Sequence, residues 1–276
     1  MNIRRKPEWL KINLSAGSSF SATRSAISAN GVHTVCQSAK CPNLGECWAR
    51  GSAAFMILGE NCTRACRFCA VSHNTPLPPD PNEPARVAAA IKEMKLKHAA
   101  LTSVTRDDLA DGGARHWASV IQEVRKENPD TKIEVLVPDF CGDYDCVQTV
   151  LNAIPDIFNH NLETVEALQK SVRGKADYKT SLKVLRYATD KNFKTKSGIM
   201  LGLGESESDI KTTLRDLRGA GVSILTIGQY IAPSAKHFPI ARWVTPAEFA
   251  FWKDFALALG FAEVHSSPLT RSSRSF

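Results

Sequence analysis

The sequence predicts a partial (β/α)6 barrel of the TIM type, preceded by an irregular N-terminal extension and followed by a short C-terminal tail. Three observations predict it: six short apolar runs, at least one amphipathic stretch after each run, and a length of 276 residues. Alternating strands and helices give parallel strands joined by right-handed crossovers. An open doubly wound sheet is the alternative. In either fold the active site lies at the carboxyl ends of the strands.

The apolar runs fix the order of the predicted elements. The first, AAFMIL at 53–58, is bounded by Gly51 and Gly59 and predicts a buried strand. Further strands are predicted at 99–104, 132–138, 156–161, 196–204 and 223–230. Helices are predicted at 85–98, 115–129, 144–153, 162–170, 180–191, 206–219 and 246–259. These elements divide the chain into an extension (1–51), a barrel (52–260) and a tail (261–276).

Composition narrows the class of protein. Apolar residues make up 43% and charged residues 23%, a balance typical of a globular protein. No apolar run approaches the roughly 18 residues of a membrane span, and the opening MNIRRKPEWLKINL lacks the stretch of a secretory signal. We therefore expect a cytoplasmic protein with no membrane association. In that reducing compartment its eight cysteines favour metal binding or redox work over disulfides.

The formal charge of +7 is concentrated at the N-terminus, where residues 1–50 hold seven Lys and Arg against two Glu. No run of five or six basic residues occurs, and aromatic residues are not interleaved with the basic ones, so nucleic acid is not the expected partner. An acidic protein partner or a negatively charged cofactor fits this charge better.

Three cysteines, Cys62, Cys66 and Cys69, lie within ENCTRACRFCAVSH at 60–73. A tetrahedral zinc site needs a fourth ligand, which His73 or Glu60 could supply. A 4Fe-4S cluster with one iron left without a protein ligand explains the number three more directly, because that iron is free to bind a small molecule.

The spacing C-x3-C-x2-C, with Phe68 before the last cysteine, resembles the radical S-adenosylmethionine (SAM) enzymes. The resemblance implies that the open iron binds the amino and carboxylate groups of SAM, which one electron then cleaves to a 5'-deoxyadenosyl radical. It also implies that Phe68 packs against the adenine; a core phenylalanine is the alternative.

A second triplet, Cys36, Cys41 and Cys47, lies in CQSAKCPNLGECW. Alone, this spacing fits zinc or an iron-sulfur cluster. The order C-x4-C-x5-C followed by C-x3-C-x2-C closely resembles the lipoyl synthase family. Other stretches resemble that family in the same order over nearly the whole chain: LTSVTRDDLADGGA, IEVLVPDF, FNHNLETV, KSGIMLGLGE, LTIGQY and PLTRSS.

This resemblance implies a sulfurtransferase that inserts two sulfur atoms, at the sixth and eighth carbons of a protein-bound octanoyl-lysine. It implies two 4Fe-4S clusters, the auxiliary one held by the second triplet with Ser273 as fourth ligand and acting as sulfur donor. The implied partners are octanoylated lipoyl carrier domains of 2-oxo acid dehydrogenases or the glycine cleavage H protein, a flavodoxin or ferredoxin electron donor, and an iron-sulfur carrier for cluster repair. An acidic carrier surface could meet the basic N-terminal segment.

Further SAM contacts are expected at two strand ends. Gly198, Met200, Gly202 and Glu205, in and just after the run at 196–204, match the radical SAM pattern G-x-(hydrophobic)-x-G-x-x-E, which the resemblance places on the adenine side of SAM. Gly202 and Gly204 would let the backbone approach a ligand closely. A glycine turn before a helix capped by Ser206 and Asp209 is an equally good structural interpretation. Asn161 and Glu163, after the strand at 156–161, could reach the ribose or amino acid part of SAM.

Some residues do not fit the family pattern. Arg274 stands where the family has a tyrosine after the Arg-Ser-Ser motif, and Cys141 and Cys146 match no family motif, so we expect them to be structural or incidental thiols. No P-loop or Rossmann glycine motif is present. Two alternatives are open: another two-cluster radical SAM enzyme that modifies a peptide or RNA, and a non-enzymatic iron-sulfur electron carrier.

Overall fold

The computed structural model describes residues 5–11 and 18–273, and Arg274 lies outside them. Its centre is a curved sheet with the sequential order β1 to β8, in which β2 to β8 are parallel and β1 is antiparallel to β2. The strands are β1 (His33–Thr34), β2 (Ala54–Ile57), β3 (His98–Ser103), β4 (Lys132–Leu136), β5 (Ile157–Asn159), β6 (Thr195–Leu201), β7 (Ile224–Gln229) and β8 (Glu263–Ser266).

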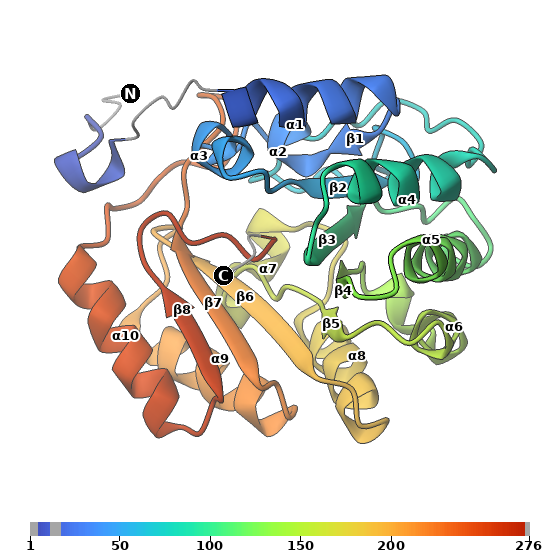
Figure 1. Ribbon diagram of the computed structural model, residues 1–276. Coiled ribbons are helices and arrows are strands. Elements are labelled where there is room, and N and C mark those ends of the chain that lie inside the picture. Colours follow the sequence, from blue (N-terminus) through green and yellow to red (C-terminus); the bar gives the residue numbers. More distant parts are fainter. Residues whose placement is uncertain (1–4, 12–17, 274–276) are drawn as a thin grey trace.

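Helices cover the outside of this sheet (Figure 1). They are α1 (Ser18–Ala29), α2 (Val35–Ser38), α3 (Leu44–Ala49), α4 (Glu83–Glu93), α5 (Ala114–Glu127), α6 (Tyr144–Asn152), α7 (Glu166–Val172), α8 (Tyr178–Asp190), α9 (Glu207–Gly219) and α10 (Pro246–Ala258), with short 3-10 turns η1 (Glu8–Leu10) and η2 (Phe140–Gly142). The sequential strand order, without the switch point of a doubly wound sheet, confirms the partial barrel.

The six predicted strands are β2 to β7, and the seven predicted helices are α4 to α10. The predicted strands are buried apolar runs, as expected for parallel strands covered by helices. The core has two main parts: one packs α4, α5 and α6 against β2 to β5, and the other packs α9 and α10 against β6 to β8.

The two ends of the chain hold more regular structure than the sequence predicted. In the extension, α1 packs on α3: the Phe20 and Trp48 rings lie 5.4 Å apart, and the Thr23 hydroxyl donates to the Trp48 carbonyl. The serine-rich sequence of α1 has modest helix propensity, so tertiary packing stabilises this helix. In the predicted tail, Glu263–Ser266 forms β8 beside β7. Its polar, four-residue sequence gives no clear strand pattern.

Candidate active site

The loop after β2 carries the first cysteine triplet and is bound to two other parts of the barrel. The Cys62 amide donates to the Ser72 carbonyl within the loop, and the Thr63 amide donates to Thr105 after β3. The Arg67 amide donates to Val172 at the end of α7. Backbone N–H groups of Arg64 and Thr105 also lie 3.4 and 3.3 Å from the Cys62 sulfur. The loop therefore holds Cys62 in a preorganised position with donors directed at its thiolate.

A buried arginine clamps the same loop. The Arg64 guanidinium forms two hydrogen bonds to the Asp107 carboxylate and two to Asp139, at 2.7 to 2.9 Å. Burial alone would raise the pKa of Asp139, but hydrogen bonds and charge from Arg64 lower it to about 2. Asp107 follows β3 and Asp139 follows β4, so one side chain joins three neighbouring loops.

The second triplet lies in the extension, with Cys36 on α2, Cys41 in the following turn and Cys47 on α3. The Cys41 amide donates to the Cys36 carbonyl, which folds the turn back on α2. The Asn43 side chain donates to the Leu269 carbonyl at 2.7 Å. The extension is thereby attached to the chain just before the Arg-Ser-Ser motif.

The C-terminal tail enters the barrel over two glycines. A Cβ on Gly228 of β7 would lie 2.2 Å from the Thr270 carbonyl oxygen, and one on Gly198 of β6 would lie 3.3 Å from the Ser272 Cβ. The buried Asn159 amide of β5 donates to the Ser272 hydroxyl at 2.9 Å. Only glycine admits such a close approach at Gly228, so the sequence of β7 positions the tail.

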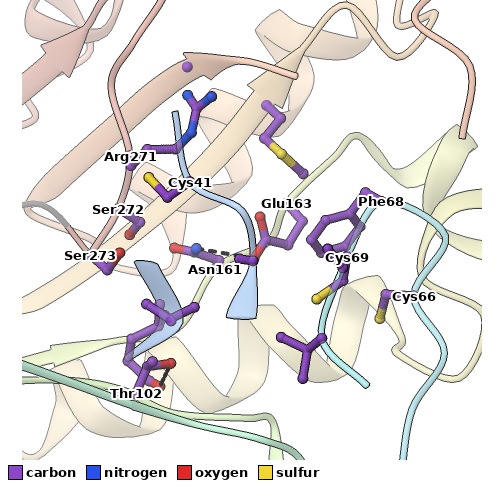
Figure 2. Close-up of a pocket in the computed structure, with 18 of the residues that line it drawn as sticks. Cys41, Cys66, Phe68, Cys69, Thr102, Asn161, Glu163, Arg271, Ser272 and Ser273 are labelled. Atoms are coloured by element: carbon purple, nitrogen blue, oxygen red, sulfur yellow. Dashed lines mark hydrogen bonds between the residues drawn. The ribbon is translucent and has the colours of Figure 1, made fainter. Parts of the chain in front are cut away.

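These parts meet at one cavity of about 510 Å³. It is lined by nine of the predicted site residues: Cys36, Cys41, Cys62, Cys66, Phe68, Cys69, Asn161, Glu163 and Ser273. In Figure 2, Cys41, Ser272 and Ser273 lie on one side, Cys66, Phe68 and Cys69 lie on the other, and Asn161 is between them. The structure thus brings the first triplet, two cysteines of the second triplet and the tail to a common space.

Four predicted residues do not line this cavity: Cys47, Gly202, Gly204 and Glu205. The Glu205 carboxylate accepts the backbone N–H groups of Gly202, Leu203 and Gly204, at 2.7 to 3.1 Å. Gly202 and Gly204 have φ of +96° and +114°. Glu205 therefore ties together the loop after β6, whose glycines supply the backbone conformation.

The polar wall of the cavity is formed by the half-buried Asn161 and Glu163 and the buried Arg173. The Asn161 amide donates to Glu163 at 3.1 Å, and the Arg173 guanidinium donates to the Asn161 carbonyl at 3.2 Å. Burial raises the pKa of Glu163, although Arg173 and Asn161 counteract it. The Asn161 side-chain oxygen is buried without a partner among the described residues. A polar ligand in the cavity would satisfy it.

The donor set fits iron-sulfur clusters. Burial removes three of these thiols from water, which raises the pKa of Cys66 and raises the pKa of Cys36 and Cys69 to about 12. Such soft thiols lose their protons when metal binds. In the described part of the chain, no three His, Cys, Asp or Glu side chains group as ligands of a single metal ion. A cluster presents several irons, so its thiolates need not converge on one point.

Sequence reasoning missed three arginines at this site. Arg64 carries no spacing signal, because its partner Asp139 lies 75 positions away, and Arg173 belongs to no recognisable motif with Asn161, 12 positions before it. Arg271 was identified only as part of the Arg-Ser-Ser motif, yet burial lowers its pKa while the charges of Cys41 and Glu163 act to raise it. Arg271 is thus near both the second triplet and the polar wall.

The two cysteines outside the triplets are free thiols in different surroundings. Cys146 is buried on α6 in the core. Cys141 is exposed, and its sulfur lies 3.3 Å from an Arg64 nitrogen.

Comparisons with known proteins agree with this geometry. Residues 56–217 match the radical SAM superfamily. Lipoyl synthase of Bacteroides fragilis is 49% identical over 98% of this chain and 93% of that protein. Lipoyl synthase of Chlorobium chlorochromatii is 50% identical, again over 98% and 93%.

Solved structures share the fold at low identity. Methylornithine synthase (PylB) aligns with a TM-score of 0.57 at 13% identity, over 94% of this chain and 81% of its own. Streptococcus suis SuiB bound to the precursor peptide SuiA aligns with a TM-score of 0.61 at 10% identity, over 77% of this chain and 48% of its own. No described helix has the length and apolarity needed to cross a membrane.

Proposed function

Because this chain belongs to the lipoyl synthase family of radical SAM enzymes, we propose that it inserts sulfur at the sixth and eighth carbons of a protein-bound octanoyl-lysine, giving the lipoyl group. The observation that carries this proposal is the cavity that is lined by the whole first triplet, by Cys36 and Cys41 of the second triplet, and by Ser273. A sulfur donor and a site of radical formation must both reach the same acyl chain, and one shared cavity meets that requirement.

We assign Cys62, Cys66 and Cys69 to the SAM-binding cluster, and Cys36, Cys41, Cys47 and Ser273 to the auxiliary cluster. When bound, these two 4Fe-4S clusters and SAM supply the radical and the sulfur. Phe68 lies beside Cys69 at the cavity wall and offers an aromatic face to the adenine. Asn161 and Glu163 offer hydrogen-bonding groups to the amino acid or ribose part of SAM.

Ser273 differs chemically from the thiolates that it joins. A hard oxygen is a weaker ligand than sulfur for iron in a cluster, so this position suits a ligand that is released when sulfur is donated. The contact between Asn159 and Ser272 holds the neighbouring residue, leaving Ser273 directed to the cavity.

Three parts of the chain share this work in the proposal. Residues 1–51 bind the auxiliary cluster, 52–260 form most of the radical SAM barrel, and 261–276 add β8 to its sheet and supply the serine ligand. Gly202, Gly204 and Glu205 order the end of β6.

The substrate is an octanoylated lipoyl carrier domain, of a 2-oxo acid dehydrogenase or of the glycine cleavage system. Apolar residues in the cavity wall, among them Val104, Val137 and Ile199, suit an acyl chain. A flavodoxin or ferredoxin would deliver electrons and an iron-sulfur carrier would rebuild the auxiliary cluster, in the cytoplasm.

The test measures iron, sulfide and Mössbauer spectra of anaerobically reconstituted protein, before and after adding SAM, dithionite and an octanoyl-lysine peptide. We expect about eight irons per chain, corresponding to two four-iron clusters, and loss of about half as 6-thio-octanoyl and lipoyl products form. Cys41→Ala should keep SAM cleavage but lose sulfur insertion, whereas Cys69→Ala should lose both. Cys141→Ala is the control, because this cysteine lies outside both triplets.

Wild-type protein with about four irons would contradict the two-cluster assignment. Eight irons that survive SAM cleavage without sulfur transfer would contradict the proposed reaction.

A further inference from the structure

Exposed basic residues lie in the Cys62–Cys69 loop and in the two segments that contact it, and together we call them the cluster-loop surface: Arg67, Lys170, Lys175 and Lys236. Contacts of Arg67 join these segments. Its guanidinium donates to the Ser171 carbonyl and lies 4.8 Å from the centre of the Phe238 ring, and its carbonyl accepts the Phe238 amide. Lys170 and Lys236 are near in sequence to these partners.

The loop separates this surface from the cavity. Cys66 and Phe68 line the cavity, whereas Ala65 and Arg67, which alternate with them, are exposed on the outside. The Cys66 sulfur lies 3.5 Å from the Arg173 carbonyl at the end of α7, and a His237 ring nitrogen lies 3.1 Å from the Cys69 carbonyl. Only the Cys62–Cys69 loop would thus separate a protein docked on the cluster-loop surface from the thiols of the SAM site.

The charge of this surface is predominantly positive. The exposed acids near it in sequence are Glu166, one turn before Lys170, and Asp177, whose carboxylate accepts the Thr180 amide at the start of α8. Among the described residues, neither Lys170 nor Lys175 has an ion-pair partner. Unpaired charge of one sign steers an oppositely charged partner and is effective in the small, transient interfaces of redox proteins.

We infer that the cluster-loop surface docks an acidic one-electron carrier protein, of the ferredoxin class. This inference rests on the proposed function, which needs one electron for each SAM cleaved. The ferredoxin is oxidised by one electron, and the SAM-binding cluster is reduced by one. An acyl carrier is the less suitable occupant, because its octanoyl-lysine must enter the cavity, whereas an electron can cross the loop.

The test compares Lys170→Glu/Lys175→Glu with a control, Lys95→Glu/Lys97→Glu. Both pairs of lysines are exposed, and both double substitutions change the net charge by the same amount. Lys95 and Lys97, however, precede β3 at the opposite end of the barrel. Binding of an acidic [2Fe-2S] ferredoxin to the reconstituted holoenzyme is measured by calorimetry at low and high salt. The rate of SAM cleavage is measured with reduced ferredoxin and, separately, with dithionite.

For Lys170→Glu/Lys175→Glu we expect at least about tenfold weaker ferredoxin binding at low salt, a smaller difference at high salt, and slower ferredoxin-driven cleavage. Dithionite-driven cleavage should stay within about twofold of wild type, because a small reductant needs no docking surface. The control should resemble wild type in every assay.

Equal losses in both variants, or no loss in the first, would overturn the inference. So would a selective loss of lipoyl product on an octanoylated carrier protein with ferredoxin binding unchanged, since the surface would then dock the carrier. Failure of the proposed function itself is distinguishable: wild-type protein with dithionite would make no thiolated product.

Discussion

At the scale of single residues, His160 shows how burial fixes the chemical state of a side chain beside the cavity. Its Nδ1 lies 2.8 Å from the Val137 carbonyl, so this nitrogen carries the proton, and Nε2 lies 3.0 Å from the Ser181 hydroxyl, whose proton it accepts. Burial, with the charge of Arg173, lowers the pKa of His160 to about 4. The imidazole is therefore neutral at physiological pH.

This neutral state predicts a pH-dependent stability. The unfolded chain binds a proton near pH 6.5, whereas the folded chain does so only near pH 4. Protonation of His160 therefore leaves the free energy of unfolding unchanged above pH 6.5. As the pH falls from 6.5 toward 4, it lowers the free energy of unfolding, by up to about 3 kcal/mol. Urea unfolding of the cluster-free chain between pH 7 and 4.5 should show a smaller loss for His160→Gln than for wild type.

His73→Gln is the matched control, because His73 is exposed in the loop after β2. Equal pH dependence in wild type and His160→Gln would show that His160 is not held neutral by burial.

At the scale of elements, the barrel loops are stabilised as a group. Arg64 links the loop after β2 to Asp107 after β3 and to Asp139 after β4. Removing one partner of a buried ion pair is costly, because the other charges are left uncompensated. The clamp therefore contributes to the position of the Cys62–Cys69 loop before any cluster is bound.

Arg64→Lys should lower the free energy of unfolding by about 2 kcal/mol, because lysine keeps the charge but not the paired hydrogen bonds. Urea unfolding of the cluster-free chain measures it, and proteolysis within residues 60–75 should become faster. Arg115→Lys, which changes an exposed arginine paired with Asp111, should have an effect below about 0.5 kcal/mol. Similar small effects for both variants would contradict the clamp.

At the scale of the whole molecule, the site depends on chain segments that are far apart in sequence. The extension, the barrel and the tail each supply part of the cavity wall. Gly228 is where the tail crosses β7, and no side chain fits between them.

Gly228→Ala should displace the tail and with it Ser273. We expect SAM cleavage to persist, sulfur insertion to fall at least tenfold, and the C-terminal peptide to be cleaved faster by carboxypeptidase in the cluster-free chain. Gly219→Ala is the control: a Cβ there meets no atom within 4 Å, and alanine favours the helix. Normal sulfur insertion by Gly228→Ala would show that the tail can be held in another way.

The sequence alone determined the elements of the barrel and the chemistry of its ligands. Strands β2 to β7 were predictable because a parallel strand covered by helices needs a continuous apolar run. The cysteine triplets were recognisable because their spacing is local, within 12 residues for the second triplet and eight for the first. Helix α1 and strand β8 were missed, because packing against α3 and β7 outweighs their weak local patterns.

Only the tertiary structure decided how these parts meet. Asn43 and Leu269 are separated by 226 positions, and nothing in either local sequence specifies their hydrogen bond. The contacts of Glu205 were likewise visible only in the structure: three backbone N–H groups donate to its carboxylate and order the loop after β6. Hydrophobic periodicity and motif spacing reflect interactions between residues close in sequence. A shared cavity, in contrast, arises from contacts that form only once the barrel has brought distant segments together.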